Sequence, residues 1–246
     1  MRAHVALWLL LAPGVAELDG QAMTDTTITA MGIVKAERAG ASQWGLFLPT
    51  PIVVRGVRLS WLAFGGTANQ ASPLEEHFVE ALGTVRFHTD AAGVAAATLL
   101  DPQLKEREPP GTVHNTVQLS ITQRAAVALA VVPSRVAWHD STGRASGVSP
   151  ILLFRLVNHG DVPIQMTFPG YEVICVRVRS LEPAVVDTSW AIKLPGARNI
   201  SLIIGQRFQE ILTLPPEAAP KVGRYRVRVG LCGIEYGAEM MLDVIG

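Results

Sequence analysis

The chain has 246 residues, of which 49% are hydrophobic and 17% charged, and its 21 basic and 21 acidic residues give a formal net charge of zero. This composition excludes a chain that is disordered throughout, because such chains combine low hydrophobicity with high net charge. Zero net charge argues against a strongly basic nucleic-acid binder, although a local basic surface is compatible with it. Two cysteines are too few for a disulfide-dense scaffold or a four-cysteine zinc site.

Residues 1–22 have the layout of a secretory signal peptide. A short, weakly basic start precedes an apolar run from Val5 to Ala12, which is too short to span a bilayer. Gly20 and Ala22 are the small residues expected before a cleavage point, and cleavage after Ala16 is a second option. We therefore predict export to the periplasm or the exterior, with no membrane span in the mature chain. The alternatives are a buried N-terminal strand and a true start at Met23.

Alternation of apolar and polar residues, interrupted by Gly and Pro, predicts an all-β protein. In the N-terminal part, strands are expected over residues 26–35, 44–48, 52–54, 57–64 and 83–88. One helix is predicted over Pro73–Leu82, because Ser72 can cap it and Leu74, Phe78 and Leu82 follow one helical face. Residues 101–116 are polar, charged and rich in proline, so they are expected to form a loop or an excursion between domains.

Three strands, a helix and a further strand with this glycine placement resemble a small OB-fold barrel over about residues 26–90. The resemblance implies a face that binds oligonucleotides or oligosaccharides with interleaved aromatic and cationic side chains. The candidates for that face are Trp44, Phe47, Arg55, Arg58 and Trp61. The alternative is that the aromatic residues fill the core and the arginines are solvated.

A second strand-rich region begins near Val117 and carries more specific motifs. The apolar strand 151–157 ends in the turn Asn158-His159-Gly160-Asp161, where Gly160 is expected to supply a positive φ. Trp190 follows the middle strands, Gly205-Gln206 precedes a later strand, and Gly223-Arg224-Tyr225 opens the last hairpin. Tyr225 is expected to form a tyrosine corner and Trp190 to anchor the core.

These motifs look like the intracellular proteinase inhibitor (BsuPI-like) domain, an immunoglobulin-like β-sandwich, over about residues 127–246. The resemblance implies protein binding and, in some members, protease inhibition. The export signal departs from a family described as intracellular. At roughly 100–150 residues per domain, the chain after the signal predicts two domains. We expect an OB-like barrel over residues 23–116 and an immunoglobulin-like sandwich over residues 117–246.

Strand alternation predicts where the two cysteines and several arginines lie. Cys175 and Cys232 share parity with arginines, so both are expected on an outward face. They can form a disulfide if their Cα atoms lie within about 7 Å, and otherwise they are separate thiols. The same parity gathers five arginines on one face, if the two strands share a sheet: Arg177, Arg179, Arg224, Arg226 and Arg228. Such a face suits a carboxylate-rich, phosphorylated or sulfated partner, and a solvated face balanced by acids is the alternative.

No motif for catalysis or metal binding is present, such as H-E-x-x-H, an EF-hand loop, C-x-x-C, G-x-S-x-G or G-x-G-x-x-G. The histidines lack metal-ligand spacing, and Asp140-Ser141-Thr142-Gly143 is interpreted as a turn rather than an aspartic-protease motif. We therefore predict no catalytic residue, no metal and no cofactor.

The leading hypothesis is an exported, non-enzymatic protein-binding module, either a protease inhibitor or an envelope-assembly factor, whose partner is another protein. A second hypothesis is an oligosaccharide or nucleic-acid binder that uses Trp44, Trp61 and the arginines, although the charge balance disfavours nucleic acid. A third is a hydrolase whose Ser-His-Asp triad is assembled in space from distant residues.

Overall fold

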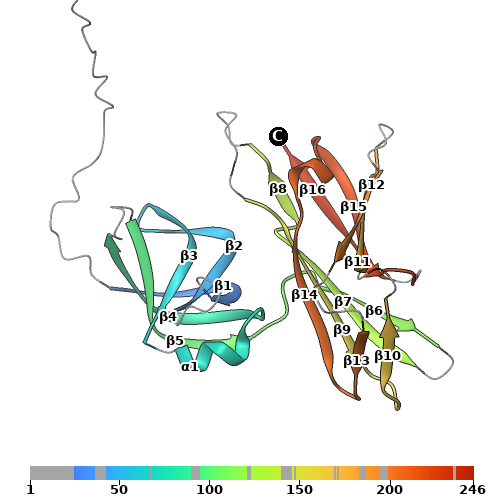
Figure 1. The fold of residues 1–246 in the computed structure, drawn as a ribbon. Helices are drawn as coiled ribbons and strands as arrows, with labels where there is room; N and C mark the ends of the chain where they lie inside the picture. Colours follow the sequence, from blue (N-terminus) through green and yellow to red (C-terminus); the bar gives the residue numbers. More distant parts are fainter. Residues whose placement is uncertain are drawn as a thin grey trace, which may run out of the picture.

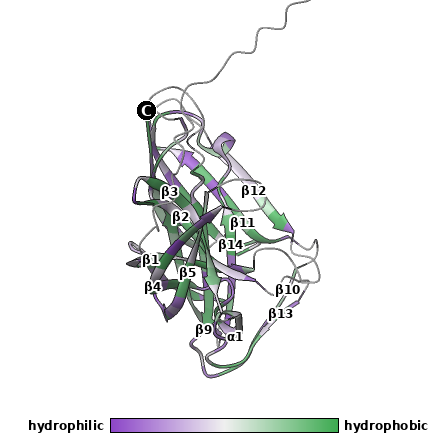
Figure 2. Cartoon of the chain, turned by 90° about the vertical axis from the view of Figure 1, so that its left-hand side faces the viewer, coloured by the Kyte–Doolittle hydropathy of each residue, from purple (hydrophilic) through white to green (hydrophobic). Residues whose placement is uncertain are grey.

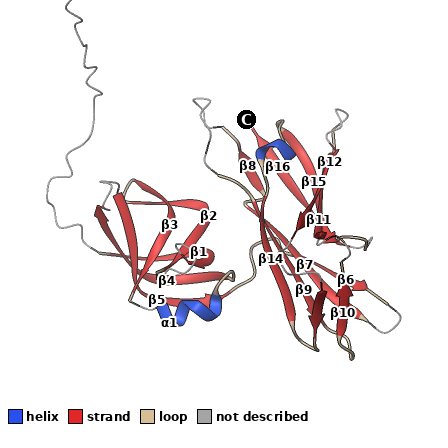
Figure 3. Cartoon of the chain, in the orientation of Figure 1, coloured by secondary structure: helices blue, strands red, loops and turns tan. Residues whose placement is uncertain are grey.

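The structure is a computed structural model. It describes residues 25–36, 43–66, 68–89, 95–120, 123–139, 146, 148–168, 170, 172–182, 187–193, 199–234 and 237–246. The expected signal peptide and the turn at 140–143 lie outside these residues. Strands dominate the described chain (Figure 3), and helix is confined to α1 (Ala68–Ala71), η1 (Ser72–Leu74) and η2 (Pro216–Ala218). No helix in the described part is long and apolar enough to cross a membrane.

The first five strands close into a barrel in the order β1-β2-β3-β5-β4, in which β3 and β5 are parallel and the other neighbours antiparallel. Their bounds are β1 (Thr26–Ala36), β2 (Trp44–Val54), β3 (Val57–Gly65), β4 (Phe78–Thr89) and β5 (Ala95–Glu106). The barrel core includes Val34, Leu46, Leu62, Val85 and Leu99. This closed barrel agrees with the small N-terminal barrel that the sequence predicts.

The hairpin between β2 and β3 shows how the local sequence sets the barrel's register. Arg55 and Gly56 both have positive φ, 52° and 78°, and this pair of left-handed residues suits a two-residue hairpin turn. The two strands expected over 44–48 and 52–54 are one strand, β2, with a register shift between Phe47 and Ile52. The irregularity bends β2 without ending its pairing to β3.

The predicted helix over Pro73–Leu82 is wrong. Helical structure ends at Leu74, and β4 begins at Phe78, where it pairs with Ile33 of β1. Within β4, Val79 and Ala81 are buried in the barrel core, whereas Leu82 is 40% exposed. A period-2 pattern therefore overrides the helical spacing, because β4 hydrogen-bonds to β1 on one side and to β5 on the other.

The loop or interdomain excursion expected over 101–116 is wrong at both ends and holds only for the connection between Glu106 and Val113. Residues 101–106 continue β5, where Leu104 packs against the barrel core, and Val113–Gln118 form β6. The charged residues of these strands lie on solvent-facing positions, so their polarity does not exclude strand pairing. Because β6 pairs with β7, the chain passes from barrel to sandwich between Glu106 and Val113, a few residues before the division expected after residue 116.

The remaining strands form a sandwich of two packed sheets beside the barrel (Figure 1). One sheet has the order β14-β9-β7-β6 and the other β12-β11-β15-β16-β8, while β10 pairs with β13. Their bounds are β7 (Arg124–Val132), β8 (Arg135–Ala137), β9 (Ile151–Asn158), β10 (Ile164–Thr167), β11 (Glu172–Ser180), β12 (Asp187–Lys193), β13 (Asn199–Leu202), β14 (Arg207–Thr213), β15 (Gly223–Leu231) and β16 (Gly237–Ile245).

The sandwich core lies between these sheets, and hydrophobic and hydrophilic residues share the same strands (Figure 2). Phe154 and Leu156 of β9 face Val176, Tyr225 and Val227 of the second sheet across this core, and each is at most 1% exposed. The alternation of inward apolar and outward polar residues along each strand is that of a β-sandwich.

Asn158 joins two of the sequence motifs. It is 1% exposed, and its side-chain amide donates to the carbonyls of Val162 and Leu202 at 2.9 and 3.0 Å. Its backbone N–H donates to the Gln206 carbonyl, so the turn after β9 and the Gly205-Gln206 motif are one hydrogen-bonded unit. The positive φ expected at Gly160 is wrong; a Cβ there would lie 3.3 Å from the Arg124 nitrogen, so close backbone approach favours glycine.

Tyr225 and Trp190 take the structural roles expected from sequence. The Tyr225 hydroxyl donates to the Lys221 carbonyl at 2.8 Å and accepts from the Lys221 N–H at 3.1 Å, which confirms the tyrosine corner. Trp190 lies on β12 opposite Val176 and packs against the sandwich core. Because β12 is an edge strand, the ring is only half-buried.

Candidate functional site

The five predicted arginines lie on the outer face of the sheet that contains β11 and β15. These two strands are neighbours, with Arg177 directly opposite Arg228 and Arg179 directly opposite Arg226. Arg224 continues the same face along β15, and all five side chains are exposed. The structure therefore brings together the arginines that parity placed on one face. We call Arg177 with Arg228 the first arginine row and Arg179 with Arg226 the second.

Acids of the flanking strands pair with three of the five arginines. Arg177 donates to both carboxylate oxygens of Asp187 on β12, at 2.8 and 2.5 Å. On β16, Glu239 lies 3.1 Å from Arg226 and Asp243 lies 2.9 Å from Arg224. Arg179 and Arg228 form no hydrogen bond or ion pair with any residue that the structure describes. Within the described part of the chain, each row thus holds one guanidinium in an ion pair and one outside any ion pair, although the Arg179 charge still acts on Asp187.

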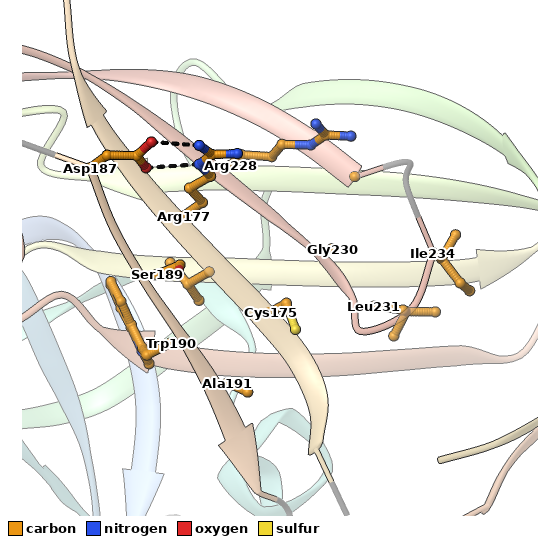
Figure 4. Close-up of a pocket in the computed structure, with 12 residues that line it drawn as sticks. Cys175, Arg177, Asp187, Ser189, Trp190, Ala191, Arg228, Gly230, Leu231 and Ile234 are labelled. Atoms are coloured by element: carbon orange, nitrogen blue, oxygen red, sulfur yellow. Dashed lines mark hydrogen bonds and ion pairs between the residues drawn. The ribbon is translucent and has the colours of Figure 1, made fainter. Parts of the chain in front are cut away.

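A row of small residues lies next to the first arginine row, and their short side chains leave a depression in this face of the sheet. In register across four strands are Ala191, Cys175, Gly230 and Gly237. Over them lies an open groove of about 750 Å³ whose lining also includes Arg177, Arg228, Trp190, Leu231 and Ile234. Figure 4 shows Arg177 turned toward Asp187, while the Arg228 guanidinium extends away from that carboxylate. We call this feature the arginine groove.

The two cysteines form a disulfide within this region. The Cα atoms of Cys175 and Cys232 are 5.0 Å apart and their sulfurs are bonded. Cys175 is exposed, which places the disulfide on the outer face rather than between the sheets. The Cys232 N–H also donates to the Val173 carbonyl at 3.0 Å. The bond therefore fixes the turn that follows β15, which carries Ile234, against β11.

Asp187 holds the charged side chain of Arg177 in place within the groove. The hydrogen bond from Arg177 lowers the pKa of the Asp187 carboxyl, with the Arg177 and Arg179 charges contributing, and it raises the pKa of Arg177. Asp187 therefore stays ionised at neutral pH and holds Arg177 in one orientation. Since both groups are solvent-exposed, this pair positions a side chain more than it stabilises the fold.

The aromatic and cationic candidates of the barrel do not share one surface. Trp44 packs against the barrel core, and Phe47 packs against the seam between barrel and sandwich. The Trp61 ring lies over Gly45, where a Cβ would collide with it, and Arg58 is exposed opposite Val53 on the hairpin. Arg55 occupies the turn itself. The stacking platform that the OB resemblance implies is thus divided among core, seam and hairpin.

Apolar side chains fill the seam between the barrel and the sandwich. Ile33 and Phe78 from the barrel meet Ala130, Ile151 and Leu153 from the sandwich. A cavity at its margin, lined by Phe78, Arg155 and Gln209 among others, measures about 10 Å³. That volume accommodates about one water molecule. At this margin the seam is therefore a packed contact.

Ionic groups surround the seam, and sequence reasoning missed them because they come from distant strands. Arg207 of β14 donates to Glu106 of β5 at 2.7 Å and approaches Nδ1 of His77 at 3.0 Å. Gln209 donates to the Glu76 carbonyl across the same boundary. Burial, followed by the Arg207 charge, lowers the pKa of His77 below its ordinary value of 6.5, although Glu106 acts in the opposite direction.

We expect the lowered pKa of His77 to make the fold less stable as the pH falls. Between its folded and unfolded pKa values, the unfolded chain binds the proton more tightly, so stability is lost as pH drops through about 6.5. Urea unfolding at pH 7, 6 and 5 should show this loss, and His77→Gln should reduce it. Substitution of the exposed His159 by Gln is the matched control. Equal pH dependence in wild type and His77→Gln would contradict the assignment.

Among the described residues, no three His, Cys, Asp or Glu side chains are grouped to hold a metal ion. No protein-family model matches the chain, and no curated protein matches it significantly. The resemblance of the C-terminal half to the BsuPI-like domain therefore stays a prediction, and the candidate site rests on its own geometry.

Proposed function

We propose that the chain is an exported, non-enzymatic protein-binding module that binds an acidic part of another protein with the arginine groove. The observation that carries this proposal is the pair of arginine rows. Like charges placed directly opposite each other destabilise a sheet, and here two such pairs occur in succession. With three carboxylates against five guanidinium groups, the described face is incompletely neutralised.

The proposed function has two forms: a protease inhibitor, which the predicted resemblance to the BsuPI-like domain implies, and an envelope-assembly factor, which fits the predicted export. Export, which the N-terminal sequence predicts, would bring the module to its partner outside the cytoplasm. The groove is open rather than a closed cleft, and it suits a protein surface or segment better than a small substrate.

Site-specific photocrosslinking in cells of the source organism tests the proposal. We place p-benzoylphenylalanine at Ser189, which lies in the groove beside Arg177, and separately at Arg58 on the barrel hairpin. The expected result is a discrete protein adduct from position 189 and none of the same mass from position 58. No adduct from position 189, or the same adduct from both positions, would overturn the proposed binding surface.

A protease panel distinguishes the two forms of the function. The purified chain is mixed at micromolar concentration with serine, cysteine, aspartic and metalloproteases. Inhibition that is lost in an Arg179→Gln/Arg228→Gln variant supports the inhibitor. Unchanged activity of the whole panel, together with an adduct from position 189, excludes the inhibitor and favours the envelope-assembly factor.

If the arginine rows serve binding, their like charges should lower the stability of the folded protein. The Arg228→Gln variant tests this expectation. The variant removes the like-charge contact with Arg177 without breaking an ion pair of Arg228 to a described residue. We expect its melting temperature to rise by about 1 °C. Arg224→Gln is the matched control, because it breaks the pair with Asp243 and should not raise the melting temperature. A lower melting temperature for Arg228→Gln would show that the row is stabilising.

A further inference from the structure

The groove and the two arginine rows form a regular series along β11 and β15. The small-residue row contains Cys175 and Gly230, the first arginine row lies two residues further along each strand, and the second lies two residues beyond that. Successive rows are therefore separated by about 7 Å. An extended polypeptide has the same spacing between side chains that point to one side, at positions i, i+2 and i+4.

The three rows also differ in chemistry. Over the small-residue row, the groove has room for a side chain, and Ile234 beside it supplies apolar lining. Trp190 and Leu231 also border the groove and pack against the sandwich core. In the next two rows, Arg228 and Arg179 have no ion-pair partner among the described residues, while Asp187 and Glu239 already hold the other two arginines. A smaller hollow of about 140 Å³ lies between the two arginine rows.

We propose that the arginine groove binds an extended segment of a partner protein in which one apolar residue and two acidic residues alternate with other residues. The apolar side chain occupies the groove over Cys175 and Gly230. The two carboxylates pair with Arg228 and Arg179. This inference rests on the proposed function, because it specifies the part of the partner protein that binds.

Guanidinium chemistry and the match in spacing favour this occupant. A guanidinium binds a carboxylate with two parallel hydrogen bonds, so each unpaired arginine suits one Asp or Glu side chain. The apolar position supplies an anchor that charge alone does not give, and it fixes the register of the segment. The segment can run in either direction along the strands. In both directions its apolar residue lies over the small-residue row and its two acidic residues lie over the two arginine rows.

Labelled peptides of one composition and different order test the spacing. Fluorescence anisotropy is measured with Gly-Leu-Ser-Glu-Ser-Glu-Gly, its reverse, and the rearranged Gly-Glu-Ser-Leu-Ser-Glu-Gly. We expect at least one of the first two to bind about tenfold more tightly than the rearranged peptide, and added NaCl to weaken the binding. Equal affinities for all three, no binding, or binding of a heparin oligosaccharide without peptide binding would overturn the inference.

Matched double variants locate the carboxylate contacts. The Arg179→Gln/Arg228→Gln variant is expected to bind the tighter-binding of the two ordered peptides about tenfold or more weakly than the wild type does. Arg58→Gln/Arg135→Gln removes the same total charge from outside the two rows and should leave the affinity unchanged. Ile234→Ser should reduce the advantage of the ordered peptide over the rearranged one. Equal losses in the two double variants would show nonspecific charge attraction and would overturn the inference.

The two proposals fail separately. An adduct from position 189 without any order dependence among the peptides leaves the binding surface in place and rejects the proposed segment. Order-dependent peptide binding without a cellular adduct supports the segment chemistry and rejects the proposed function in those cells.

Discussion

Replacing Cys175 and Cys232 by alanine is expected to lower the free energy of unfolding by about 3–4 kcal/mol, one of the two largest effects that the structure predicts. The two residues are 57 positions apart, so the disulfide closes a long loop that includes β12, β13 and β14. Chain-entropy arguments give a larger stabilisation for a longer loop, because the bond restricts the unfolded chain more. Urea unfolding at 25 °C measures the difference.

Reduction of the wild-type protein provides the control for the alanine variant. If the loss comes from the crosslink, the wild type unfolded in a dithiol reductant should resemble the double-alanine variant in oxidising buffer. The double-serine variant should fall close to both, because the Cys175 position is exposed and tolerates a hydroxyl. A loss below about 1 kcal/mol in every case would contradict a stabilising crosslink.

The same variant separates stability from binding. The disulfide holds the turn with Ile234 beside the groove. Its loss should therefore also weaken the binding of the ordered peptide in conditions where the chain remains folded. Arg228→Gln is expected to raise the stability of the fold while it weakens the binding of the same peptide. A fold defect alone would not produce this combination.

The arginine face could be predicted from sequence because strand parity is a local property. Arg177 and Arg179 alternate with buried Val176 and Val178, and the same rule holds around Arg226 and Arg228. Parity does not determine register, which depends on how β11 and β15 pair in space. The opposition of Arg177 to Arg228, and the row of small residues beside it, could therefore be obtained only from the structure.

The helix predicted over Pro73–Leu82 failed because a short segment can satisfy helical and strand patterns together. Phe78 and Leu82 are four residues apart, which suits one face of a helix, and they also share parity in a strand. The buried Val79 and Ala81 of β4 resolve the ambiguity, since pairing to β1 and β5 decides which side chains face the barrel core. That pairing joins distant residues, so local propensity could not reveal it.

Sequence reasoning also missed the seam between the domains. Ile33 and Phe78 look like ordinary strand residues, yet they pack against the sandwich instead of lying in the main barrel cluster. Phe47 also packs against this seam, so it does not belong to the nucleic-acid face that the OB resemblance implies. Local alternation can identify an apolar strand face, but not whether that face meets its own core or a neighbouring domain.

Replacing Asn158 by alanine is expected to destabilise the protein by about 3 kcal/mol, the other large effect. The change removes bonds to the carbonyls of Val162 and Leu202 and to the Gly160 N–H. Asn158 is 1% exposed, so water does not readily replace the lost partners. The loss therefore includes the cost of unpaired groups as well as the hydrogen bonds themselves.

Asn199→Ala is the matched control, because Asn199 lies on the exposed side of β13 near the same connection and should change stability by less than about 0.5 kcal/mol. Asn158→Asp keeps the acceptor for the Gly160 N–H but replaces the amide donor with a charged oxygen facing two carbonyls. It should therefore be at least as destabilising as alanine at neutral pH. Urea unfolding that ranks aspartate with wild type, above alanine, would show that the amide donor is not what joins the turn after β9 to β13.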